Sequence, residues 1–76
     1  MTIFQLECYY ALAQSLNFTQ TASQQYITQP ALSRSISSLE KELGVPLFLP
    51  KGRNIVLTEY GKYLQEKLRP ILTVLD

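Results

Sequence analysis

The 76-residue chain has no histidine and only one cysteine, Cys8. A single cysteine excludes a disulfide within the chain, and the absence of histidine removes the commonest zinc ligand and the commonest general base. The three glycines, Gly44, Gly52 and Gly61, are isolated, so they form no glycine-rich phosphate-binding loop. We therefore expect a protein that is not an enzyme and that holds no metal and no cofactor.

The sequence also lacks a long apolar run. No stretch approaches the ~20 apolar residues that a membrane-spanning helix requires. The first residues contain neither the basic segment nor the apolar core of a signal peptide. A cytoplasmic protein with no membrane partner is therefore expected. A chain of this length forms one small domain, which buries only ~60% of its unfolded surface.

Acidic residues are absent from residues 8–39 and from residues 43–58. The charges within these two windows are Arg34, Lys51 and Arg53, all positive. A surface built from these windows would offer hydrogen-bond donors without repelling phosphates, although the net charge is only +1. A small domain with few charges could also show such gaps by chance, so this feature alone leaves both interpretations open.

Residues 18–43 contain two helix patterns separated by a short break. Thr19 is predicted to cap the first, which runs to about Gln25. The second begins with Thr28 as its N-cap and Pro30 in its first turn, and it ends at Gly44. Its apolar positions recur at helical spacing and predict one buried stripe: Leu32, Ile36, Leu39 and Leu43.

The opposite face of this second helix is polar. It carries short hydroxyls, one amide and one guanidinium, which are groups that reach base edges and phosphates in a DNA groove: Gln29, Ser33, Arg34 and Ser37. A preceding helix is expected over residues 1–16, with Thr2 as its N-cap. Two short helices joined so closely are typical of a helix-turn-helix, although tight helix pairs also occur in proteins that never bind DNA.

A β-hairpin is predicted after the second helix. Residues 47–49 and 55–57 are short β-favouring runs, and residues 50–54 between them are typical of a turn. Lys51 and Arg53 would lie at its tip. Beside a groove-binding helix they would form a wing that contacts the DNA backbone or minor groove. An ordinary solvated turn is the alternative.

The last predicted helix spans residues 59–76, with Thr58 as its N-cap and Pro70 interrupting its interior. Its apolar stripe has little of the domain left to pack against, so we expect it to face a second copy or a following domain. The alternative is that it folds back on the first helix. The dimerisation residues predicted on this basis are Tyr60, Leu64, Leu68, Ile71, Leu72 and Leu75.

The central string T-Q-P-A-L-S-R-S-I-S-S-L-E-K-E-L-G-V-P-L-F is followed by G-R and then by L-T-x-x-G. With the opening I-F-Q-L and the later F-T-Q-T-A, it resembles the N-terminal DNA-binding domain of LysR-type transcriptional regulators over essentially the whole chain. The resemblance implies a mainly α fold: a winged helix-turn-helix over residues 1–58 (a three-helix core plus a β-hairpin wing). A long linker helix for dimerisation would follow over residues 59–76. The chain is expected to be truncated before the effector-binding domain.

The resemblance further implies sequence-specific binding to an interrupted palindrome in double-stranded promoter DNA. The protein would bind as a dimer or higher oligomer, and a small-molecule effector would bind only in the missing C-terminal domain. Gln29 and Ser33 would read bases in the major groove, while Thr28 and Arg34 would hold phosphates or base edges. The remaining residues expected at the DNA are Pro30, Ser37, Lys51 and Arg53.

Two departures from the family pattern stand out. Gln25 occupies a position where the family usually has a core leucine, so its amide needs a partner or Tyr26 and Ile27 must fill the gap. Pro50 replaces a common wing arginine, which predicts fewer phosphate contacts from the wing. A winged-helix module for protein–protein contact is the alternative function. It would require an exposed apolar patch on the third helix, whose outer face is polar instead.

Overall fold

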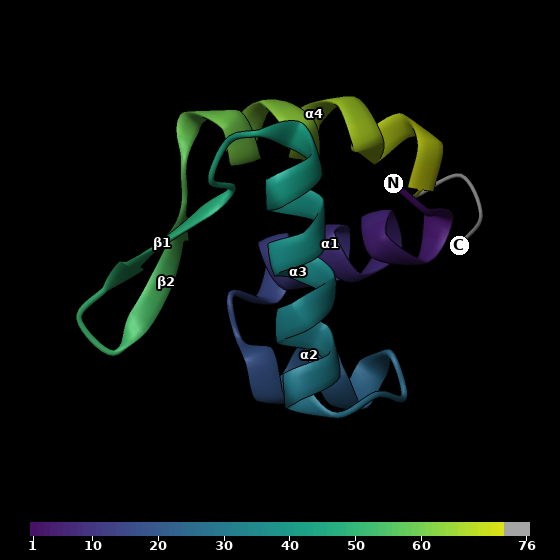
Figure 1. Cartoon of the computed structure of the whole chain (residues 1–76), viewed down its shortest axis with the longest axis vertical. Helices are drawn as coiled ribbons and strands as arrows, with labels where there is room; N and C mark the ends of the chain where they lie inside the picture. Colours follow the sequence, from purple (N-terminus) through teal and green to yellow (C-terminus); the bar gives the residue numbers. More distant parts are fainter. Residues whose placement is uncertain (73–76) are drawn as a thin grey trace.

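The computed structural model describes residues 1–72. These residues form α1 (Ile3–Ser15), α2 (Phe18–Gln24), α3 (Gln29–Leu43), β1 (Phe48–Lys51), β2 (Asn54–Leu57) and α4 (Glu59–Leu72). In Figure 1, α3 runs through the centre, with α4 across one end and α2 beside the other. Helix α1 packs against the other three helices, and the hairpin extends to one side. This mainly helical architecture with a two-stranded wing is the fold that the sequence predicted.

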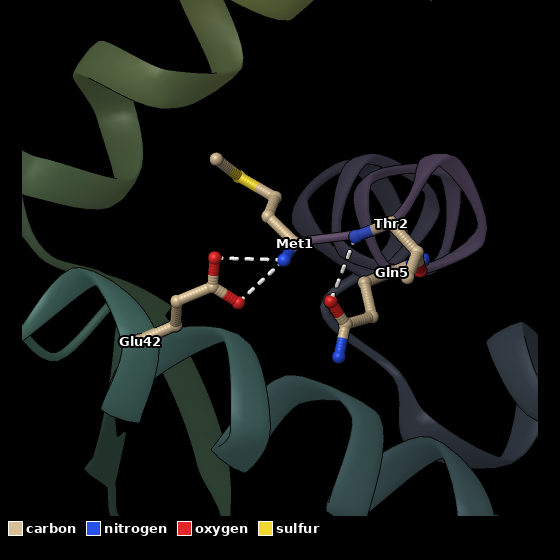
Figure 2. Close-up of polar contacts among 4 residues, drawn as sticks. All are labelled: Met1, Thr2, Gln5 and Glu42. Carbon is tan, nitrogen blue, oxygen red and sulfur yellow. Dashed lines mark hydrogen bonds and ion pairs between the residues drawn. The ribbon is translucent and has the colours of Figure 1, made fainter.

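Helix α1 begins with a reciprocal cap. The Thr2 side chain accepts a hydrogen bond from the Gln5 backbone N–H at 3.0 Å, and the Gln5 side chain accepts one from the Thr2 backbone N–H at 3.0 Å. Figure 2 shows the second of these bonds. The helix ends at Leu16, which takes the left-handed conformation with φ of 54°. The predicted N-cap and the predicted end of this helix are both confirmed.

Helix α2 starts earlier than the sequence analysis predicted. Its N-cap is Asn17, whose side-chain oxygen accepts a hydrogen bond from the Gln20 backbone N–H at 3.0 Å, and Phe18 is the first helical residue. The prediction that Thr19 caps this helix is therefore wrong. Because Leu16 already turns the chain through its left-handed conformation, the helix can begin at once, and the Thr19 hydroxyl is not needed as a cap.

The predicted bounds of the third helix agree with α3. Thr28 is its N-cap, with its hydroxyl accepting from the Ala31 backbone N–H at 3.2 Å, and Gly44 ends it with a φ of 76°. The buried stripe is shorter than expected, because Leu43 is 38% exposed. The buried residues of the stripe are Leu32, Ile36 and Leu39, which all lie in the core.

The core lies where α1, α2, α3, the start of the hairpin and α4 meet. The Tyr9 ring is completely buried and packs against the ring of Phe48, with the centroids 5.5 Å apart. The Tyr9 hydroxyl donates a hydrogen bond to the Gly61 carbonyl in the first turn of α4. The buried hydrophobic residues are Cys8, Tyr9, Tyr10, Leu12, Ala13, Ala22, Leu32, Ile36, Leu39, Leu47 and Leu68.

The hairpin strands are paired over more residues than the β-favouring runs suggested. The register runs from Phe48 opposite Leu57 to Lys51 opposite Asn54, so the turn contains only Gly52 and Arg53. Gly52 has a φ of 61°, and glycine in a left-handed conformation at the first turn position is the signature of a type II′ hairpin turn. Residues 50, 51 and 54, predicted as turn, therefore belong to the strands.

Helix α4 packs back on α1, which corrects the expectation that its apolar stripe lacks a partner within the chain. Leu68 is only 6% exposed, and Leu64 and Leu72 are partly buried against the same core. The helix includes Pro70 and continues to Leu72. Leu75, also predicted on this stripe, lies outside the described residues. None of the helices within residues 1–72 is long and apolar enough to cross a membrane.

Candidate nucleic-acid interface

The polar face of α3 lies on the surface. Leu32, Ile36 and Leu39 anchor the helix in the core. The side chains on the opposite face are all exposed, as the periodicity predicted: Gln29, Ser33, Arg34 and Ser37. This helix therefore presents amide, hydroxyl and guanidinium groups on a rigid backbone, with no bulky apolar residue among them.

The N-terminal end of α3 is also exposed. Thr28 and Pro30 both lie on the surface, and Thr28 satisfies one of the free backbone N–H groups of the first turn. Pro30, within the first two helical positions, has no N–H to satisfy. A shallow apolar hollow adjoins this end, lined by Phe18, Gln29, Pro30 and Ser33.

The turn between α2 and α3 holds an unusual aromatic residue. Tyr26 takes a left-handed conformation with φ of 60°, and its side chain is 95% exposed. Ile27 instead packs against the core, and Gln25 is half-buried. Of the two residues expected to fill the space beside Gln25, Ile27 packs against the core, whereas the Tyr26 side chain lies in solvent.

A hydrogen bond joins the two helices at the outer surface. The Gln29 side-chain nitrogen donates to the Thr19 hydroxyl at 2.9 Å, and both residues are exposed. This contact of Thr19 was not expected from the sequence, where the residue was predicted to be a cap. Since Asn17 provides that cap, the Thr19 hydroxyl is available to a residue ten positions later in the chain.

The cations of the hairpin lie near the start of α2 and the end of α1. Arg53 lines a hollow together with Asn17, Phe18 and Thr19 at the start of α2, so the wing and the helix-turn-helix share one continuous face. Lys51 lies on β1 and lines an adjoining hollow at the end of α1. Lys51 and Arg53 are both exposed.

Two acidic residues near the end of α3 are engaged by other groups. The Glu40 carboxylate accepts hydrogen bonds from the backbone N–H groups of Leu47 at 2.7 Å and Phe48 at 3.2 Å. Figure 2 shows Glu42 with both carboxylate oxygens on the Met1 amino group, at 2.5 and 2.7 Å. Their negative charges are thus partly compensated at the end of α3 remote from Thr28.

The predicted dimerisation residues do not share one side of α4. Tyr60 and Ile71 are exposed (57% and 62%), whereas Leu64, Leu68 and Leu72 pack inward. Tyr63, which was not among the predicted residues, is 66% exposed and has the Lys67 amino group 5.3 Å from its ring centroid. A helical projection could have found it, because Tyr60, Tyr63, Lys67 and Ile71 follow i, i+3, i+7 and i+11 spacing.

The two side chains whose pKa values are raised, Cys8 and Tyr9, both lie in the core. Cys8 is completely buried, and burial raises the pKa of its thiol, which favours the unreactive neutral form. Burial likewise raises the pKa of Tyr9 to about 12, so its hydroxyl stays protonated and can donate to Gly61. Within residues 1–72, no group of three histidine, cysteine or acidic residues is placed to hold a metal ion.

The chain is similar in sequence to known bacterial regulatory proteins. A family model described as the bacterial regulatory helix-turn-helix protein, lysR family, matches residues 3–62. The transcriptional activator CmpR of Synechocystis is 37% identical over 75 residues, covering 99% of this chain and 25% of the relative. The uncharacterized transcriptional regulator YybE of Bacillus subtilis is 46% identical over 68 residues, covering 90% of this chain and 23% of the relative. The chain thus spans about a quarter of these relatives.

Two solved structures with the same architecture are complexes with DNA. The BenM DNA-binding domain bound to catB site 1 DNA is 32% identical, with a TM-score of 0.90 over 100% of this chain and 84% of that chain. The CbnR DNA-binding domain bound to DNA is 33% identical, with a TM-score of 0.87 over 99% of this chain and 86% of that chain.

Proposed function

The chain belongs to the lysR family of bacterial regulatory helix-turn-helix proteins, and we propose that it is the sequence-specific DNA-reading domain of a transcriptional regulator. It binds double-stranded promoter DNA in the cytoplasm. The observation that carries this proposal is the outer face of α3, where Gln29, Ser33, Arg34 and Ser37 are all exposed on a helix anchored from behind. Such a helix fits the major groove, and these side chains match the donors and acceptors of base edges.

The surrounding residues complete the interface. Thr28 and Pro30 present the N-terminal end of α3, where backbone N–H groups favour a phosphate. Lys51 and Arg53 extend the surface along the wing toward the DNA backbone or minor groove. Pro50 adds no charge at the wing, so we expect the wing to contribute fewer phosphate contacts than an arginine at that position would allow.

We also propose that two copies bind together on an interrupted palindrome. Residues 1–58 form the DNA-binding unit, and the helix that begins at Glu59 brings the second copy into register. Its exposed residues Tyr60, Tyr63 and Ile71 form the contact, because the inward residues of α4 are already used within the chain. Dimers of this kind place two recognition helices in successive major grooves. Effector binding belongs to a further domain of the complete regulator.

Arg34→Ala tests the recognition helix. The variant removes a guanidinium that can form paired hydrogen bonds with guanine, so specific binding should weaken by about 1–3 kcal/mol. Fluorescence anisotropy of the 76-residue chain with a labelled duplex from upstream of its own gene, at fixed salt, measures the loss.

The matched control is Arg69→Ala, which removes the same charge from α4, outside the proposed interface. We expect little change in affinity from this control. Equal losses from both variants would indicate only a nonspecific charge effect. Unchanged binding by Arg34→Ala would contradict the assignment of α3, and no binding by the wild-type chain would favour a protein-interaction module.

A further inference from the structure

The hydrogen bond between Thr19 and Gln29 restricts a side chain that is otherwise free to turn. Gln29 is the first residue of α3, and Thr19 is the second residue of α2. The Gln29 side-chain nitrogen donates to the Thr19 hydroxyl at 2.9 Å. An exposed glutamine has several rotatable bonds, and its amide can be turned either way. In the structure the amide lies with its nitrogen toward Thr19 and its carbonyl oxygen turned away from it.

The position of Thr19 is itself set by the surrounding structure. Asn17 caps α2, and the Thr21 hydroxyl lies 2.7 Å from the Ser15 hydroxyl at the end of α1. The first contact fixes the start of α2, and the second ties its first turn to the end of α1. The hydroxyl that receives Gln29 is therefore held by a capped helix packed on the core, and not by a mobile loop.

The bond determines which groups of Gln29 remain for a ligand. A primary amide has two N–H donors and one carbonyl acceptor. Thr19 takes one donor, which leaves one N–H and the carbonyl oxygen side by side. Adenine presents the complementary pair in the major groove, an acceptor at N7 and a donor at N6. The opposite orientation, with Thr19 bonded to the carbonyl, would leave two donors and match guanine instead.

We propose that Thr19 is a positioning residue that orients Gln29 to read adenine. This inference rests on the proposed function and adds the identity of the base and the residue that selects it. Thr19 also lines the hollow that contains Arg53, so it lies between the wing and the recognition helix, where bound DNA would exclude water. A hydrogen bond in such an environment is electrostatically stronger than one in water.

Selection from a library of random double-stranded DNA tests the proposal. The wild-type chain, Thr19→Val, Thr19→Ser and Gln29→Ala are compared after far-ultraviolet circular dichroism has confirmed that each is folded. Gln29→Ala identifies the base position that Gln29 reads, because preference is lost there. Wild type should prefer adenine at this position. Thr19→Val keeps the shape of threonine without its hydroxyl, and it should reduce that preference about two- to tenfold, the range expected for one hydrogen bond.

Thr19→Ser is the matched control, since it keeps the hydroxyl and should retain the adenine preference. Preference for guanine at the Gln29 position would overturn the proposed orientation. A Thr19→Val profile equal to that of wild type would overturn the inference, as would equal losses at every position or an unchanged Gln29→Ala profile. Failure of wild type to select any sequence would instead count against the proposed function itself.

Discussion

At the scale of single residues, Gly61 allows α4 to approach the hairpin closely. A Cβ atom there would clash with the Leu47 carbonyl oxygen and would lie 2.9 Å from a Leu57 methyl carbon. The Gly61 carbonyl also receives the Tyr9 hydroxyl, and its N–H donates to the Thr58 side chain at 3.0 Å. The glycine is required by packing and not by an unusual backbone angle.

Gly61→Ala should therefore destabilise the fold, although alanine is the better helix former. Helix propensity favours alanine by about 1 kcal/mol. Overpacking against a backbone carbonyl typically costs about 1–3 kcal/mol, and a carbonyl cannot rotate away as a side chain can. Urea unfolding followed by circular dichroism should show a net loss. Lys62→Ala, one residue later and exposed, should stay within about 0.5 kcal/mol. A more stable Gly61→Ala variant would show that the close approach is not required.

At the scale of elements, Glu40 attaches the hairpin to α3. Its half-buried carboxylate accepts from the backbone N–H groups of Leu47 and Phe48, which lead into β1. On the other side, the Thr58 hydroxyl donates to the Pro46 carbonyl at 2.7 Å. Hydrogen bonds thus hold the wing at both of its ends, and those of Glu40 connect it to α3. Hydrogen bonds to a charged group are about twice as strong as neutral ones.

Glu40→Gln should weaken this attachment while it preserves the shape of the side chain. We expect a loss of about 1–2 kcal/mol in the free energy of unfolding, because a neutral amide replaces a charged acceptor of two hydrogen bonds. Faster hydrogen exchange at the Leu47 and Phe48 amides, measured by NMR, would locate the effect at the base of the wing.

Glu42→Gln is the matched control on the same helix. The Glu42 ion pair with the Met1 amino group is exposed, so its loss should cost at most about 1 kcal/mol and should leave both amides protected. If Glu40→Gln changed stability and exchange no more than this control, the carboxylate would not be what holds the wing.

At the scale of the whole molecule, α4 has two apolar sides, one packed in the core and one exposed. Leu64, Leu68 and Leu72 complete the core against α1. The exposed side carries Tyr60, Tyr63 and Ile71. A mostly apolar hollow beside it is lined by Leu43, Val45, Leu47, Glu59, Tyr60, Tyr63 and Leu64. Large apolar side chains left together on one helix side mark an interaction surface, and a second copy is the partner that the proposed function requires.

Tyr63→Asp should shift the chain from dimer to monomer without unfolding it, because the side chain is 66% exposed. Burying a carboxylate between two apolar surfaces is strongly unfavourable, so the dimer should dissociate. Sedimentation velocity over a range of concentrations measures the change. Lys62→Asp introduces a carboxylate at another exposed position of α4, outside the proposed contact of Tyr60, Tyr63 and Ile71. This control should leave the dimer intact. A stable Tyr63→Asp dimer would exclude this side of α4 as the contact.

Much of the helix-turn-helix is determined by local sequence. The bounds of α3 follow from a Thr28 cap, an early Pro30 and a left-handed Gly44, which act within one helical turn of each end. The exposure of its polar side follows from periodicity, and Gly52 predicts the hairpin turn. The family resemblance rests on the same short segments. These features are predictable because each is decided by residues close together in the chain.

The tertiary structure decided what depends on distant residues. It showed that the Thr19 hydroxyl meets Gln29 of the next helix, and that Glu40 reaches across to the wing. It also decided which side of α4 faces inward, since both sides are apolar and periodicity alone cannot choose between them. The choice depends on α1 and on the buried Tyr9 bonded to Gly61, so it is a property of packing between the two ends of the chain.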